Sequence, residues 1–234
     1  MDFSLTTGLA SKRGRYLGNE DNKAESIDSF ELGYQNLIFK NRVKGLINFF
    51  FDNTDNIIEH RHVRNEVISG QTLPVMQLIN SGESKAKGVE IGAELLLTKQ
   101  ITTFLNYTFQ EVENKGVISV APTGRFGEKF APKNKVNAGI NYSLNDNIDL
   151  SIDYHFVDEV KWERPVWSSA TGSESVLFLT TEPYHLWDIN IAYQTPKKDF
   201  EASLGIFNLF DYRHREWITG PGEAGAVSSK AVVK

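Results

Sequence analysis

The feature that most constrains this chain is a polarity pattern that changes at every residue over many short segments. From Ile148 to Phe156 the apolar residues occupy the even positions, and polar or charged residues occupy the odd ones. Successive side chains of a β-strand point to opposite faces, whereas a helix with 3.6 residues per turn would mix the two sets. The pattern therefore predicts a strand with one oily face and one polar face.

The same alternation recurs along most of the chain and predicts about nine strands. The predicted strands cover residues 3–10, 29–35, 43–52, 89–98, 101–110, 136–143, 148–156, 187–194 and 200–207. No segment shows the periodicity of a long amphipathic helix. The predicted fold class is therefore all-β.

The connections between these strands alternate strictly between short and long. Short turns are expected at 39–41, 98–100, 145–147 and 195–199, and long connections at 11–27, 53–75, 114–132 and 161–183. In an antiparallel up-and-down meander, this order places every short turn at one rim and every long loop at the other. Transmembrane barrels of the bacterial outer membrane have short periplasmic turns and long extracellular loops, whereas a Greek-key sandwich has no reason to alternate so regularly. The meander is therefore expected to be part of a transmembrane β-barrel.

Composition narrows the possible classes of protein. The chain has no cysteine, which excludes a disulfide scaffold, a thiolate metal site and a cysteine nucleophile. Its net charge of −5 argues against a nucleic-acid partner, because such proteins usually carry a basic surplus. No apolar run approaches the roughly 20 residues of a spanning helix, but a barrel strand needs only about 9–11 residues of alternating polarity.

The two predicted faces of the strands differ in charge. The polar face carries carboxylates, whereas the strand centres of the oily face carry no charged residue. A lysine or arginine at the bilayer midplane of a barrel costs about 2–4 kcal/mol, so lipid would require such a clean face. A packed soluble core would require it too, and both interpretations stay open at this point.

Four segments carry a family resemblance. Residues 25–34 read ESIDSFELGY, residues 80–90 read NSGESKAKGVE, residues 131–137 read APKNKVN, and residues 204–213 read LGIFNLFDYR. In this order and spacing they resemble the C-terminal part of the barrel of TonB-dependent outer-membrane receptors. The resemblance spans most of the chain.

The resemblance implies a large barrel of about 22 strands with a plug domain in its lumen. On that basis, residues 1–212 are expected to form a partial barrel, with the plug and the N-terminal strands absent, and residues 213–234 an irregular tail. The expected location is the bacterial outer membrane, and the expected function is import of a scarce nutrient such as an iron-siderophore. The implied partners are outer-membrane lipid, the receptor's own plug, the TonB energy-coupling protein acting through the missing N-terminal part, and a small ligand such as a metal chelate.

Candidate site residues follow from the predicted faces and loops. Glu31, Glu90 and Glu94 lie on the polar face, where by resemblance they would bond to the plug; simple solvation in the lumen is the alternative. In the last long loop, Trp162, Arg164 and Trp167 would line a ligand vestibule, or the aromatic residues would merely tie the loop down. Nothing in the chain predicts an enzyme active site, a catalytic residue, a metal site or a cofactor.

Two other functions fit the same pattern. The chain would be a self-contained small outer-membrane barrel or porin-like adhesin if it binds at its long loops without an energy-coupling partner. It would be a soluble β-sandwich binding module if the oily rows of two stacked layers meet in a dry core. The position of these oily rows in the structure separates the sandwich from the barrel.

Overall fold

A computed structural model describes residues 15–68, 70–115, 131–168, 173–216 and 232–233. Its strands are β1 (Arg15–Leu17), β2 (Ser26–Ile38), β3 (Val43–Ile68), β4 (Gln71–Leu96), β5 (Ile101–Lys115), β6 (Asn134–Asn145), β7 (Ile148–Val157), β8 (Val160–Ser168), β9 (Ser173–Thr181), β10 (Tyr184–Gln194), β11 (Glu201–Phe207) and β12 (Val232–Val233). The predicted strand at 3–10 lies outside the described residues.

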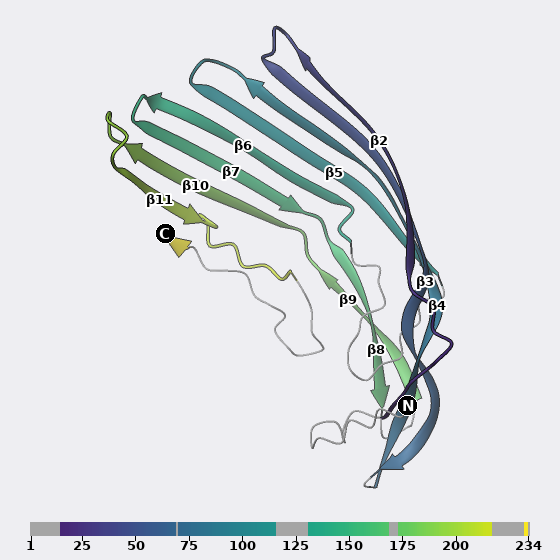
Figure 1. Ribbon diagram of the computed structural model, residues 1–234. Helices are drawn as coiled ribbons and strands as arrows, with labels where there is room; N and C mark the ends of the chain where they lie inside the picture. The colour runs from purple at the N-terminus through teal and green to yellow at the C-terminus, as the bar shows by residue number, and fades with distance from the viewer. Residues whose placement is uncertain (1–14, 69, 116–130, 169–172, 217–231, 234) are drawn as a thin grey trace.

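The main sheet is a curved antiparallel meander (Figure 1). Its order is β12-β11-β10-β7-β6-β5-β4-β3-β2, and β1 adds a parallel pairing to β4. The short turns gather at one rim, at the upper left of Figure 1, as the sequence predicts. One of them is a two-residue turn between β6 and β7, in which the side chain of Asn145 accepts a 2.9 Å hydrogen bond from the backbone N–H of Asn147. The all-β meander is therefore confirmed.

Two predicted long loops are wrong, because most of their residues form strands. β3 and β4 each contain 26 residues and run through the segment 53–75, while β8 and β9 pair as a separate two-stranded sheet within 161–183. These extensions lack clean alternation, as in His60-Arg61-His62-Val63-Arg64. A hairpin with water on both sides needs no oily row, so the sequence signal that revealed the other strands is missing there.

The long β3–β4 hairpin is bent and anchored where it leaves the main sheet. The β3–β4 register shifts between Thr54 and Ile58, and Asn56 adopts a left-handed φ of 59°. Such an irregularity bends a strand and increases its twist. The Asn80 side chain fixes this bend, because it donates 2.6 Å and 2.9 Å hydrogen bonds to the carbonyls of Asn56 and Lys23 and accepts a 2.7 Å bond from the Lys23 N–H.

The oily residues of the main sheet are not covered by a second layer. Phe30 is 68% exposed, Leu32 63%, Ile140 48% and Leu204 48%. Among the described residues, the buried hydrophobic side chains are few: Leu73, Val75 and Met76 near the beginning of β4, and Val160 at the start of β8. A sandwich would bury its oily rows between two sheets, so the soluble-sandwich alternative is wrong. No helix in the described part of the chain is long and apolar enough to cross a membrane.

Glycines on the polar face make room for aromatic rings from the next strand. Gly88 is the cross-strand partner of Phe50, and Gly139 is the partner of Phe104. A Cβ atom added at Gly88 would lie 2.5 Å from the Phe50 ring and would also collide with the carbonyl oxygen of Phe109. Each ring therefore covers a stretch of backbone that only glycine leaves free.

This packing predicts that Gly88→Ala lowers the free energy of unfolding by about 1–3 kcal/mol, because the added methyl must displace backbone or ring atoms. The measurement is the urea midpoint for loss of β-sheet circular dichroism in detergent micelles. Gly45→Ala is the matched control, since a Cβ there meets nothing within 4 Å. Equal midpoints for the two variants would contradict the packing role of Gly88.

Candidate functional site: the two faces of the sheet and its outer end

The apolar face is continuous across eight strands. The strand registers align Ile38, Val43, Leu95, Thr103, Ile140, Ile152, Ile189 and Ile206 in one row. Thr103 is the one polar member of this row, and its hydroxyl donates a 2.8 Å hydrogen bond to the carbonyl of Gly139. The other side chains of the row are purely hydrocarbon, and the one hydroxyl group has its hydrogen-bond partner.

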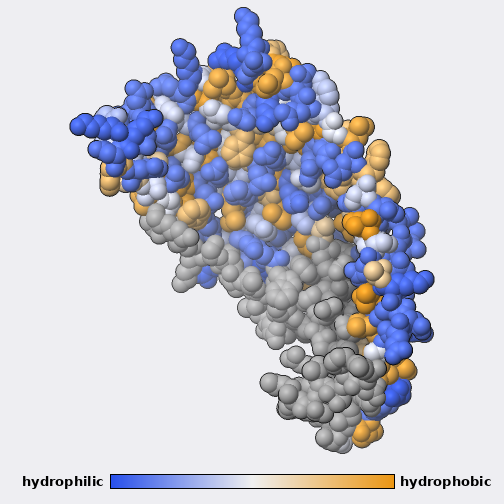
Figure 2. Space-filling view, viewed as in Figure 1, coloured by the Kyte–Doolittle hydropathy of each residue, from blue (hydrophilic) through white to orange (hydrophobic). Residues whose placement is uncertain are grey.

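The apolar face has the height of a membrane span and ends in polar side chains. On β2 the band runs from Phe30 to Ile38, which satisfies the about 9–11 residues that a barrel strand needs. At the level of Phe30, where the band ends, Lys87 lies 3.4 Å and Lys133 3.8 Å from carboxylate oxygens of Glu111. In Figure 2, hydrophilic side chains also gather at the short-turn rim and along the extension at the opposite end.

Aromatic side chains cluster on the apolar face at its outer end. The ring centroids of Tyr154 and Trp187 are 4.7 Å apart, and those of Phe156 and His185 are 4.9 Å apart. The Tyr154 hydroxyl forms a 2.7 Å hydrogen bond with Nδ1 of His185. Rings with an apolar body and a polar edge favour the headgroup level of a bilayer, and this cluster lies at the end of the apolar face that is remote from the short turns.

The predicted residues Glu31, Glu90 and Glu94 all lie on the opposite, polar face. Glu31 comes from β2 and the other two from β4, and all three are exposed. They are spread along the wall and do not form one cluster, since their cross-strand partners on β3 are Phe50, Asn48 and Lys44 respectively. Glu94 and Lys44 also line a shallow hollow of about 330 Å³ with Phe104 and its neighbours.

A second polar cluster was not predicted as a unit. Asp153 and Asp188 are direct cross-strand partners, and Nε2 of His155 lies 3.7 Å from Asp188. The buried Asn208 donates its backbone N–H to Asp188 at 2.7 Å, and His155 hydrogen-bonds to Asn137 at 2.6 Å. Asn208 belongs to the segment 204–213 that carries the family resemblance, so the sequence offered a signal for its contact with Asp188.

This cluster does not have the arrangement of a catalytic or metal site. Ser151 faces Asn141 and Asn190 across the neighbouring strands, whereas His155 is held by Asn137 and Asp188. Among the residues that the structure describes, no group of three or more His, Asp or Glu side chains is arranged to hold a metal ion. The polar face therefore presents hydrogen-bonding groups and charge.

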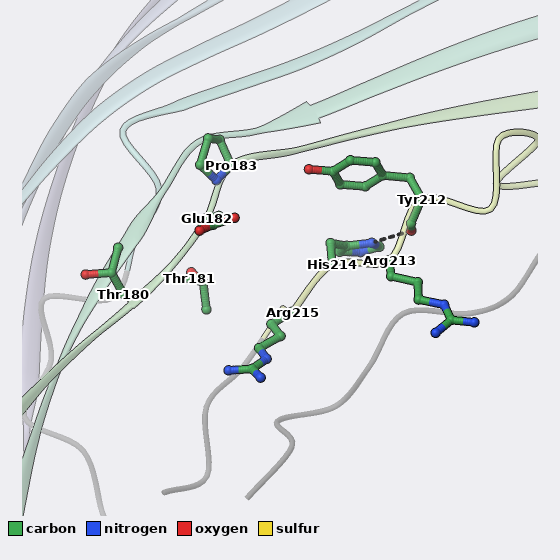
Figure 3. Close-up of a pocket in the computed structure, with 8 residues that line it drawn as sticks. All are labelled: Thr180, Thr181, Glu182, Pro183, Tyr212, Arg213, His214 and Arg215. Atoms are coloured by element: carbon green, nitrogen blue, oxygen red, sulfur yellow. Dashed lines mark hydrogen bonds between the residues drawn. The ribbon is translucent and has the colours of Figure 1, made fainter. Parts of the chain in front are cut away.

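The outer end of the sheet holds the predicted vestibule residues and a pocket. Trp162, Arg164 and Trp167 lie in β8, on a hairpin and not on an irregular loop; their side chains fall outside the described part of the structure. Between the start of β10 and the segment after β11, a pocket of about 420 Å³ is lined by residues 180–183 and 212–215 (Figure 3). Sequence reasoning missed this pocket, because the contact between its two segments is made only by the fold.

The sequence matches one family model. Residues 5–209 match the TonB-dependent receptor-like β-barrel model, which covers most of the chain. No curated protein sequence matches the chain.

Solved structures share the fold at low sequence identity. The FrpB iron transporter of Neisseria meningitidis is 16% identical with a TM-score of 0.67, over 96% of this chain and 32% of that one. The ferric-catecholate import receptor Fiu of Escherichia coli is 18% identical with a TM-score of 0.65, over 92% and 27%. The pyoverdine receptor FpvA of Pseudomonas aeruginosa is 15% identical with a TM-score of 0.64, over 89% and 29%. The chain thus spans about a third or less of the structures it matches.

The difference between the two faces can be tested with a pair of adjacent residues on β6. Ile140→Lys places a charge on the apolar face and is expected to cost about 2–4 kcal/mol of stability in the membrane. Asn141→Lys places the same charge on the polar face and should cost far less. The measurement is the amount of chain that stays in isolated outer membranes through a graded urea wash; equal losses for the two variants would refute the assignment of faces.

Proposed function

Because the chain belongs to the TonB-dependent receptor-like β-barrel family, we propose that it supplies part of the wall of an outer-membrane receptor that imports a scarce nutrient such as an iron-siderophore. The observation that carries this proposal is the apolar face continuous over eight strands, backed by a polar and largely acidic opposite face. In this role the chain is a scaffold and a seal, and it has no catalytic part.

The strand lengths support an orientation in the bilayer. The apolar band lies near the short turns. In outer-membrane barrels the short turns face the periplasm, so we place this end of the sheet on the periplasmic side. A strand of 26 residues runs about 85 Å at about 3.3 Å per residue, whereas the hydrocarbon core is about 30 Å thick. Even when tilted, β3 and β4 therefore pass well beyond the membrane on the outer side. The hairpin β8–β9 lies at the same end.

The acidic polar face supports contact with a plug domain. Glu31, Glu90 and Glu94 project from strand positions that alternate with the apolar face, so they point into the lumen. Of the described positions on this face, acidic residues outnumber the lysines Lys44 and Lys135. Basic and amide groups on a plug would pair with these carboxylates. The plug, and the N-terminal part that would engage TonB, belong to the portion of the receptor that this chain does not span.

Unpaired sheet edges also support a larger assembly. Within the described residues, β2 has no neighbour on its outer side, and β12 pairs with only Ile206 and Phe207 of β11. Backbone groups in hydrocarbon must be hydrogen-bonded, so we propose that further strands pair with these two edges in the assembled barrel. We propose that residues 1–212 form the partial barrel and that residues 213–234 form an irregular C-terminal tail.

The β8–β9 hairpin is the proposed ligand vestibule. Trp162, Arg164 and Trp167 are spaced along β8 at the outer end of the sheet. The similar structures include an iron transporter and a receptor bound to pyoverdine, which is consistent with a metal chelate as the ligand. Aromatic and guanidinium groups at this end would contact such a ligand before it reaches the plug.

The membrane orientation can be tested with single cysteines, since the chain has none of its own. Val67→Cys lies at the end of the long hairpin and Lys198→Cys in the short turn between β10 and β11. On intact cells, a membrane-impermeant maleimide should label Val67→Cys, and it should label Lys198→Cys only after the outer membrane is permeabilised. The reverse pattern, or recovery of the chain in the soluble fraction, would contradict the proposal.

The receptor part of the proposal has a separate check in the DNA that precedes the codon for Met1. We expect that region to encode a plug domain and further barrel strands. A neighbouring sequence without either would leave the small self-contained barrel as the better account.

A further inference from the structure

We propose that the rim formed by the β2–β3 turn (residues 39–42) and the β4–β5 turn (residues 97–100) binds the headgroup of an anionic phospholipid such as phosphatidylglycerol. These two turns are the tips of neighbouring hairpins in the main sheet (Figure 1). Assignment of this lipid to the periplasmic leaflet rests on the proposed function, because it uses the orientation given above, whereas binding of the lipid does not.

The two turns form one unit, because a side chain joins them. The Arg42 guanidinium donates a 3.0 Å hydrogen bond through Nη2 to the carbonyl of Leu97. Within the β4–β5 turn, the hydroxyl oxygen of Thr98 accepts hydrogen bonds of 3.1 Å and 3.0 Å from the backbone N–H groups of Gln100 and Ile101. The basic side chains of both turns therefore extend from a fixed backbone.

This unit carries positive charge without a counter-ion. Lys40, Arg42 and Lys99 are exposed, and no ion pair joins them to a residue in the described ranges. Neither turn contains Asp or Glu, and the nearest acidic residue along β4, Glu94, is the cross-strand partner of Lys44 on the polar face. Ammonium and guanidinium groups form charge-assisted hydrogen bonds to phosphate, so a phosphodiester at this rim would meet donors from both turns.

Exposed apolar side chains beside these cations indicate that the anion belongs to a lipid. Phe39 is 74% exposed and Leu97 52%. Leu97 follows Leu95 of the apolar row at a spacing of two, and Phe39 comes directly after Ile38 of the same row. A soluble anion would leave both side chains in water, whereas a phospholipid would cover them with its acyl chains while its phosphate contacts the basic groups.

The backbone of the β2–β3 turn holds Phe39 and Lys40 outward in an unfavourable conformation. Phe39, Lys40 and Asn41 adopt left-handed φ values of 54°, 56° and 62°. Glycine and asparagine tolerate this region, but a phenylalanine there is strained. Strained backbone is typical of sites where a contact made by the side chain matters more than the stability of the turn itself.

The test is native mass spectrometry of the full chain in a neutral detergent, titrated with phosphatidylglycerol or with phosphatidylcholine of the same acyl chains. Both lipids carry a phosphate, but the choline group cancels its charge. We expect phosphatidylglycerol to bind more tightly by about tenfold or more, because several cations face it. Lys40→Gln and Lys99→Gln should each lower its affinity about fivefold, as expected for one basic side chain at an anionic lipid surface, and leave phosphatidylcholine binding unchanged.

Phe39→Asn tests the apolar part of the site. Asparagine tolerates the left-handed backbone, so this variant keeps the turn and removes the ring. It should weaken the binding of both lipids by a similar factor and preserve the preference for phosphatidylglycerol.

Lys197→Gln is the matched control, because Lys197 is an exposed lysine of the same rim whose turn also carries Asp199. Its affinity for phosphatidylglycerol should equal that of the unmodified chain. The proposal is overturned if the two lipids bind equally, if Lys197→Gln weakens binding as much as Lys40→Gln, or if glycerol phosphate, which has no acyl chain, displaces the lipid at equal concentration. Binding in micelles does not depend on orientation, so the labelling of cysteines on cells can fail or succeed independently.

Discussion

Backbone hydrogen bonding in hydrocarbon is the constraint on which this structure depends. Lipid offers no partner to an exposed N–H or C=O group, so a β-sheet is stable there only when every strand in the bilayer is paired on both sides. A sheet that closes on itself meets that condition, and its strands must then alternate between a lipid-facing and a lumen-facing side chain. The continuous apolar row from Ile38 to Ile206 and the carboxylates on the opposite face are two results of this single requirement.

The same requirement explains where the chain is regular and where it is not. Inside the apolar band the register is uninterrupted from β2 to β5, and glycines such as Gly88 keep the strands close where Phe50 crosses them. Beyond the band, water satisfies the backbone, and the constraint ends. There β3 shifts register, β8 and β9 leave the main sheet, and the segment after β11 folds against β10. The β8–β9 hairpin, which we propose as the ligand vestibule, lies at this same end.

The sequence predicts the membrane-spanning part well because lipid enforces alternation residue by residue. Eight of the predicted strands correspond to β2–β7, β10 and β11, and the strand registers put Glu31, Glu90 and Glu94 on the face opposite the apolar row. The segments 53–75 and 161–183 were predicted as loops, because strands surrounded by water carry no alternation to detect. The stacking of His214 on Tyr184 joins residues from two segments whose proximity only the fold determines, so no local pattern reveals it.

The central claim, that even-numbered side chains of β7 face lipid and odd-numbered ones face a wet lumen, can be measured directly. Nitroxide labels at single cysteines from Asp149 to Tyr154 would report collisions with oxygen, which dissolves in lipid, and with a water-soluble nickel complex. We expect high oxygen and low nickel accessibility at Leu150, Ile152 and Tyr154, and the opposite at Asp149, Ser151 and Asp153. Equal accessibility at both sets, or nickel collisions at Ile152, would contradict the account.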